Sequence, residues 1–196
     1  MMPTREQAHV LLQEGLIHNP GPWGDHSRVA AHCAEAIAAV CPDLDSEKAY
    51  VLGLLHDIGR TFGTRHLGHV IDGYHYMMKL GYPEVARVCM THSFHKFHST
   101  DGYIGKFDVT PEEMEEIKKV LEKIEPNQYD YLIQLCDAMA GSDQVLDIEE
   151  RMEDVKRRYG SYPPDKWENT QNLLSYFEQK TGKNLYDLVD KEHFRP

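Results

Sequence analysis

Apolar residues recur at helical spacing along almost the whole chain, and no stretch alternates apolar and polar residues as a half-buried strand does. This pattern predicts an all-α fold, a helical bundle. A chain of 196 residues suits one domain, 1–196, with a continuous core that needs no disulfides. We expect helices over residues 5–17 (capped by Thr4), 25–41, 47–58 (capped by Asp45 or Ser46), 66–80, 83–92, 110–124 (beginning at Thr110), 129–140, 143–159, 167–180 and 185–189.

The net charge and the cysteines indicate the compartment in which the protein works and the partners that it does not bind. The formal net charge of -11 argues against nucleic acid as a partner, because that binding depends on neutralising phosphates with Lys and Arg. The beginning of the sequence lacks the basic-then-apolar order of a signal peptide, and no apolar run is long enough to cross a membrane. The four cysteines show no C-x-x-C spacing, which indicates reduced, packed thiols. We therefore expect a cytoplasmic protein without membrane contact; the sequence leaves the oligomeric state open.

Histidines are the most unusual part of the composition. The chain has 12, and seven of them fall between residues 56 and 98. Imidazole is a common ligand of transition metals, so this clustering indicates a metal site. A single histidine is more often an exposed or packed residue than a ligand. The clustering is therefore stronger evidence for a metal site than any one of these histidines.

Two carboxylates stand in apolar helical surroundings. Asp57, next to His56, ends the most apolar helix of the sequence, and Asp137 lies inside the apolar run 132–140. An unpaired buried charge is strongly disfavoured. A divalent metal held by neighbouring His and Asp would compensate both charges, whereas an ion pair with a buried Arg is the alternative for Asp137. His26, which begins a helix after a Pro/Gly loop, lies at the edge of the core where a ligand could sit.

In order and spacing, these residues resemble the H…HD…D signature of the HD superfamily, in its HDIG form. The resemblance covers about residues 23–140 and runs through His26, His56-Asp57 with Ile58-Gly59, and Asp137. It implies an all-α HD-domain bundle in which His26, His56, Asp57 and Asp137 bind a divalent or iron centre. It also implies phosphohydrolase activity. Residues 141–196 lie outside the motif region, and we assign them only as packing helices.

A subset of the superfamily has two further histidines and a binuclear site. His69, followed by Gly73, is similar to the first of these histidines, and His92 is similar to the second. The resemblance then implies two metal ions bridged by Asp57. His66 competes with His69, because it lies three residues earlier on nearly the same helix face. The residue types do not distinguish Fe, Mn, Co, Ni, Zn or Mg.

The function expected from this site is hydrolysis of a phosphate ester or anhydride of a small molecule, a nucleotide above all, by metal-activated water. Besides Asp57, the catalytic residues that we expect are Arg60 and Arg65, the basic side chains nearest the metals, either of which could bind phosphate bidentately. His95 could line a substrate channel, whereas Lys96 and His98 fit surface positions better.

Two other functions use the same residues. The six-ligand pattern also resembles that of di-iron oxygenases with the HD fold, and a metal-binding or ligand-sensing module without turnover is the third possibility. Among phosphohydrolases, the histidine pattern is closer to the branch that splits symmetrical dinucleoside tetraphosphates. The Gly-Tyr-Pro feature of the cyclic-dinucleotide branch is missing, because Gly102-Tyr103 is followed by Ile104.

Overall fold

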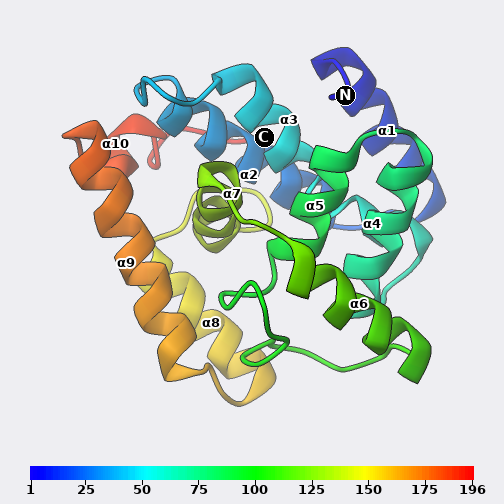
Figure 1. The fold of residues 1–196 in the computed structure, drawn as a ribbon. Coiled ribbons are helices and arrows are strands. Elements are labelled where there is room, and N and C mark those ends of the chain that lie inside the picture. The colour runs from blue at the N-terminus through cyan, green and yellow to red at the C-terminus, as the bar shows by residue number, and fades with distance from the viewer.

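The computed structural model describes all 196 residues and confirms the all-α prediction (Figure 1). It has ten α-helices and one 3-10 helix, and its only β-type pairing is an isolated bridge between Ala140 and Val145. The helices are α1 (Arg5–His18), α2 (Trp23–Ala38), α3 (Ser46–Leu55), η1 (Ile58–Phe62), α4 (Gly68–Lys79), α5 (Pro83–Thr91), α6 (Pro111–Lys123), α7 (Gln128–Met139), α8 (Ile148–Tyr159), α9 (Pro164–Thr181) and α10 (Leu185–Leu188).

Several helices begin where capping side chains predict. The Thr4 hydroxyl accepts a hydrogen bond from the Gln7 backbone N–H, and the Gln7 side chain accepts one in return from the Thr4 N–H. Thr110 begins α6 with the same reciprocal arrangement. Asp45, rather than Ser46, caps α3 by accepting a hydrogen bond from the Lys48 N–H. These bonds satisfy backbone donors that the first turn of a helix leaves free.

Two predicted helix ends are three residues off, because α2 ends at Ala38 rather than at 41 and α9 begins at Pro164 rather than at 167. Two others, which lie beside the candidate site, are also wrong. The helix expected to reach residue 58 ends at Leu55, and His56-Asp57 form the junction to η1. The helix expected from residue 143 begins at Ile148, after Asp147 caps it by accepting a hydrogen bond from the Glu149 N–H. The preceding residues turn instead, because the Gly141 N–H bonds to the Gln144 carbonyl. Both corrections alter the backbone beside the candidate site.

Helix α7 occupies the middle of the bundle (Figure 1). It packs against α2, α3 and α5 on one side and against α8 and α9 on the other. The main core lies between these helices and continues to α1 and the C-terminal segment. A smaller core lies under α6, where Ile117 and Leu121 pack with Leu67, Val70 and Phe94. Helix α4 packs against both η1 and α5.

The four cysteines, Cys33, Cys41, Cys89 and Cys136, are buried free thiols, as expected. Burial raises the pKa of Cys33 to about 12, so this thiol stays protonated at neutral pH. None of the helices combines the length and the apolar composition that a bilayer crossing requires.

Candidate metal centre

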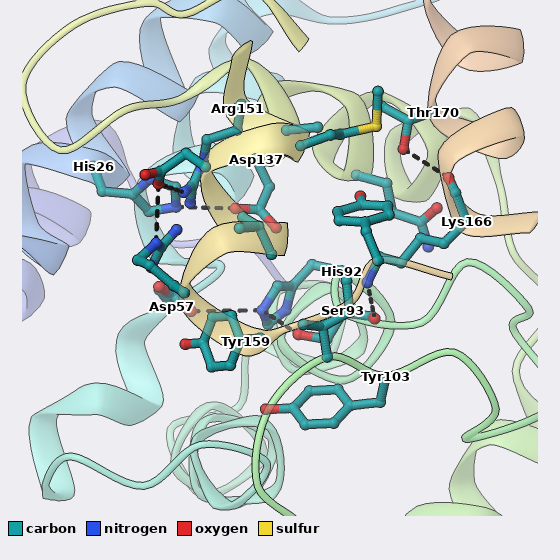
Figure 2. Close-up of a pocket in the computed structure, with 18 of the residues that line it drawn as sticks. His26, Asp57, His92, Ser93, Tyr103, Asp137, Arg151, Tyr159, Lys166 and Thr170 are labelled. Carbon is teal, nitrogen blue, oxygen red and sulfur yellow. Dashed lines mark hydrogen bonds and ion pairs between the residues drawn. The ribbon is translucent and has the colours of Figure 1, made fainter. Parts of the chain in front are cut away.

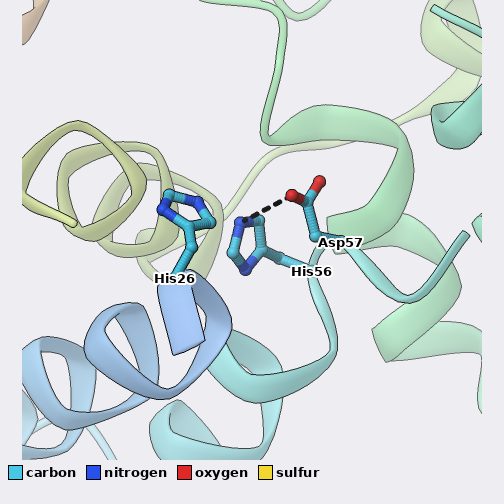
Figure 3. A group of neighbouring side chains, drawn as sticks. All are labelled: His26, His56 and Asp57. Carbon is cyan, nitrogen blue, oxygen red and sulfur yellow. Dashed lines mark ion pairs between the residues drawn. The ribbon is translucent and has the colours of Figure 1, made fainter. Parts of the chain in front are cut away.

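His56 and Asp57 lie at the junction between α3 and η1, where the chain leaves the buried helix (Figure 3). Both side chains are buried. His56 Nδ1 lies 2.7 Å from the Gly53 carbonyl oxygen, and its Nε2 lies 4.0 Å from Asp57 Oδ2. Because a carbonyl only accepts, His56 Nδ1 must carry the ring proton and donate it. The Nε2 lone pair therefore faces the carboxylate.

His26 reaches the same place from the first turn of α2 (Figure 3). Its Nδ1 lies 3.2 Å from the carbonyl oxygens of both Ala140 and Gly141, just after the end of α7. Its Nε2 lies 3.0 Å from Asp137 Oδ1, and that oxygen is 3.8 Å from His56 Nε2. The Asp137 side chain is 30% exposed, to the cavity described below, so it is less buried than its apolar helix predicts.

A glycine contact brings α4 beside His56-Asp57. A Cβ atom on Gly59 would lie 1.9 Å from the His69 carbonyl oxygen and 2.5 Å from the Gly73 backbone nitrogen. Only glycine leaves room for this approach. A Cβ on Gly73 would in turn meet the Gly59 nitrogen at 3.2 Å and Cys89 Cβ at 3.1 Å. The two glycines therefore set the distance between η1, α4 and α5, and with it the position of His69.

His69 on α4 and His92 at the end of α5 face the other oxygen of Asp57. Their Nε2 atoms lie 3.1 Å and 3.5 Å from Asp57 Oδ1 and 3.2 Å from each other. His69 Nδ1 contacts the His66 carbonyl oxygen, and His92 Nδ1 lies 3.0 Å from that of Cys89. His69 thus takes the position for which His66 competed. The His66 ring packs instead beside Tyr159, with ring centroids 6.0 Å apart.

These side chains form two groups that could each hold a metal ion. One comprises His26, His56 and Asp57, and the other comprises Asp57, His69 and His92. Within each group the potential ligand atoms lie within 4.8 Å of one another. Asp57 belongs to both groups and presents Oδ2 to His56 and Oδ1 to the other two histidines.

The polar atoms of this cluster suit a cation. His56 Nε2 and Asp57 Oδ1 are buried and have no hydrogen-bond partner. All four histidines hold Nδ1 against a backbone carbonyl, so their Nε2 lone pairs converge on carboxylate oxygens. Lone pairs this close repel one another unless a cation lies between them. The donor set, imidazole with carboxylate, is one that divalent transition metals accept.

Arg60 binds the cluster directly. Its Nε donates to Asp57 Oδ2 at 2.6 Å, and its backbone carbonyl accepts from the Asn19 side-chain amide. Burial alone would raise the pKa of Asp57, but the charge of Arg60, with smaller contributions from His69 and His56, holds it well below its usual range. Asp57 is therefore a carboxylate at all ordinary pH values.

Arg65 lies away from the cluster. Its guanidinium pairs with Asp72 at 2.9 Å and with Glu113 at 2.7 Å, and it does not line the cavity beside the histidines. Arg60 and Arg65 are only five residues apart, so the sequence did not show which of the two lies beside the metal-binding residues. The chain between them turns at Gly63, whose φ of +136° favours glycine, and this turn separates the two guanidinium groups.

Burial also sets the protonation of the histidines. Desolvation lowers the pKa of His56 to about 4, against the opposing charges of Asp57 and Asp137, and it lowers the pKa of His69 as well. Both imidazoles are therefore neutral at pH 7, which is the form that binds metal.

These shifts predict acid sensitivity of the metal-free protein. Between pH 6.5 and 4, His56 binds a proton in the unfolded chain but not in the folded one, so the free energy of unfolding falls as the pH falls. From pH 7 to pH 5 we expect a loss of about 2 kcal/mol from His56, in addition to a loss from His69. Urea unfolding of the chelator-treated protein at pH 7 and at pH 5 measures this difference in the free energy of unfolding. A stability that is constant or rises toward pH 5 would contradict the assigned protonation.

The cluster opens into a cavity of about 560 Å³. Figure 2 shows His26, Asp57 and His92 along one part of its wall, with Lys166 and Thr170 of α9 on the opposite side. Arg151 and Tyr159 of α8 also line the cavity, and Figure 2 draws them on the side of His26 and Asp57. The expectation that residues 141–196 only pack is thus too narrow, because α8 and α9 line the cavity. No signal in the sequence indicated this role, because Lys166 precedes the helix expected over 167–180, and only the structure places it in the first turn of α9.

The remaining histidine predictions concern the segment after α5. His95 lines the cavity, and its Nε2 lies 3.1 Å from Asp165 Oδ2. His98 turns away and places Nδ1 3.0 Å from the Leu121 carbonyl oxygen. Lys96 is half exposed and pairs with Asp165 outside the cavity. The structure thus places His95 where a channel residue would lie and the other two on the surface.

Residues 23–142 match the family model described as "HD domain". The chain belongs to the HD domain family. Two solved structures of the L. monocytogenes phosphodiesterase PgpH HD domain are similar to it. One, at 16% identity, covers 92% of this chain and 95% of that chain with a TM-score of 0.53. The other, in complex with cyclic-di-AMP, is 17% identical and covers 96% and 99% with a TM-score of 0.52. No curated protein matches the chain. At these identities, the solved structures establish the HD fold.

Proposed function

We propose that this HD domain is a metal-dependent phosphohydrolase that cleaves a phosphate ester or anhydride of a nucleotide. The observation that carries the proposal is the pair of donor groups that share Asp57, with each histidine held through Nδ1. His26, His56, Asp57 and Asp137 would hold one divalent ion, and Asp57, His69 and His92 a second. When bound, such ions supply an activated water and neutralise charge on phosphoryl oxygens.

The residues around the donor groups support an anionic substrate. Arg60 holds Asp57 through Nε and lines the cavity, so the rest of its guanidinium can bind a phosphoryl oxygen. Arg151, Arg158 and Lys166 add positive charge to the same cavity. A similar fold in a phosphodiesterase that binds cyclic-di-AMP agrees with a nucleotide substrate. We therefore assign the phosphate contact to Arg60 rather than Arg65.

Metal removal and reloading test the proposal. We expect the chelated protein to hydrolyse none of a dinucleoside tetraphosphate, a cyclic dinucleotide and p-nitrophenyl phosphate, as measured by separating the nucleotide products and by the nitrophenolate released. Reloading with Mn, Fe, Co, Ni, Zn or Mg should restore hydrolysis of at least one substrate with at least one metal. Elemental analysis should find two ions per chain.

Oxygen uptake, measured in parallel, distinguishes a hydrolase from a di-iron oxygenase. Iron-loaded protein that consumes O2 and hydrolyses none of the three substrates would overturn hydrolysis in favour of an oxygenase. Metal binding without turnover of any substrate would favour a sensing module instead.

A further inference from the structure

Three aromatic side chains meet at one corner of the cavity and belong to neither group of metal-binding residues. They are His66 before α4, Tyr103 in the loop before α6 and Tyr159 at the end of α8, and all three line the cavity. We call this surface the aromatic corner and define it by these three residues. Figure 2 draws Tyr159 on the side of Asp57 and Tyr103 below it. Tyr159 lies outside the residues that match the family model, so that match assigns it no role.

Contacts between the three residues hold the aromatic corner together. The rings of His66 and Tyr159 pack edge to face, with centroids 6.0 Å apart. A Cβ atom on Gly105 would lie 3.1 Å from Tyr103 Oη and 3.3 Å from His66 Nδ1, so both side chains rest against the backbone of this glycine. Gly105 has a φ of +134°, a conformation that favours glycine. The backbone thus brings the loop before α6 and the residue before α4 to the same place as the end of α8.

The aromatic corner lies next to the position that we assign to the reacting phosphate. Burial raises the pKa of the Tyr103 hydroxyl, and the positive charge of Arg60 opposes this shift. Tyr159 and Asp57 are among the smaller causes that raise it. The Tyr103 hydroxyl is therefore near Arg60, Tyr159 and Asp57, and Arg60 itself donates to Asp57 at 2.6 Å. A group bound in the corner would be the neighbour of a phosphoryl group bound at Arg60.

Tyr159 offers the most open surface of the corner. It is 42% exposed, whereas His66 and Tyr103 are half-buried. Besides His66, its ring has the neighbouring Arg158 beside it, with the guanidinium carbon 5.5 Å from the ring centroid. Aromatic surface in contact with water is unfavourable, and a second planar ring that covers it removes that surface from water. The corner therefore presents a ring to the cavity that the protein itself leaves uncovered.

We propose that the aromatic corner binds the nucleobase of the substrate by stacking, with Tyr159 as the main contact. This inference rests on the proposed phosphohydrolase function and assigns a place to the part of the substrate that does not react. A nucleotide carries a planar, uncharged base one sugar away from its phosphate, and this arrangement matches an aromatic surface beside a guanidinium group. Stacking uses the face of the base and no particular donor or acceptor, so the corner would accept different bases.

The test compares two ligands that differ only in the base. They are the phosphonate analogues of AMP and of ribose 5-phosphate, in which carbon replaces the ester oxygen so that hydrolysis cannot occur. Calorimetric titration of the Mn-loaded protein measures both Kd values. We expect Y159A to raise the Kd of the AMP analogue at least about fivefold, because the base loses its stacking partner. The Kd of the ribose 5-phosphate analogue should stay within about twofold of the wild type, because this ligand has no base to stack.

Two further variants separate stacking from other effects of the substitution. Y159F keeps the ring and should keep the affinity for the AMP analogue within about twofold. Tyr176 on α9 is the matched control, because it is 44% exposed, as Tyr159 nearly is, and does not line the cavity. Y176A should leave both Kd values unchanged, and thermal unfolding verifies that every variant is folded.

The outcomes keep this inference separate from the proposed function, because the titration involves no turnover. Equal affinity of the wild type for the two analogues, or equal losses for both in Y159A, would overturn the nucleobase site. A loss in Y159F as large as that in Y159A would also overturn it, since the hydroxyl and not the ring would then be the contact. If the protein hydrolyses nothing, a loss in Y159A that is confined to the AMP analogue still supports the site. Hydrolysis together with unchanged affinity in Y159A would overturn the site and leave the proposed function standing.

Discussion

Asp57→Asn should lower the metal content from the two ions per chain that we propose to less than one and reduce substrate hydrolysis at least about a thousandfold. The reason is that both donor groups share this carboxylate, whose two oxygens face different histidines. An amide offers one neutral oxygen in place of two charged ones, so the group of Asp57, His69 and His92 keeps no anionic ligand and the other group keeps only Asp137. A thousandfold loss corresponds to about 4 kcal/mol of transition-state stabilisation, within what metal ions supply.

Elemental analysis after desalting and an assay of substrate hydrolysis measure the two effects. Asp72→Asn is the matched control, because Asp72 lies on the same helix as His69, pairs with Arg65 and does not line the cavity. Circular dichroism of both variants shows whether the fold survives, which matters because the change removes the carboxylate partner of Arg60. Wild-type metal content together with wild-type turnover in Asp57→Asn would contradict the shared role of this carboxylate.

The resemblance to the HD superfamily implied the full ligand set, including His69 and His92, and reasoning from the residues themselves supported part of it. His56 and Asp57 are consecutive and leave a buried helix together, so they must reach the same region. His26 and Asp137 belong to helices whose apolar faces belong to one core. His69 could be separated from His66 only in the structure. The two residues are three apart on one turn, and the contact of Gly59 with α4 decides which imidazole faces Asp57.

The part of the cavity that α8 and α9 form could not be predicted in the same way. Arg151 and Lys166 carry no motif, and each reaches the cavity through the packing of α8 and α9 against α7. That packing depends on where the chain turns after α7, and the helix expected from residue 143 begins five residues later. Helical periodicity predicted that these helices exist. It could not predict that they line the cavity, because both are largely polar and the apolar pattern does not fix which polar residues face inward.

Gly59→Ala should unfold or distort the site more than any other single-methyl change in it. The added Cβ would lie 1.9 Å from the His69 carbonyl oxygen and 2.5 Å from the Gly73 nitrogen. Both atoms belong to the backbone of α4, so no side-chain rotation can relieve the overlap. Overpacking in a core lowers stability by about 1–3 kcal/mol. Because the clash is with backbone, we expect a loss of about 3 kcal/mol in the free energy of unfolding.

The functional effect of Gly59→Ala should follow from the same displacement. Moving α4 away from η1 carries His69 away from Asp57 Oδ1, where its Nε2 now lies at 3.1 Å. The group of Asp57, His69 and His92 should therefore lose its metal before the group that contains His26, and metal content should approach one ion per chain in whatever protein remains folded. Gly24→Ala is the matched control. A Cβ there would meet only the side chain of Leu16, at 2.7 Å, which can rotate away. Equal unfolding free energies and two bound ions in both variants would show that the glycine contact does not set the position of His69.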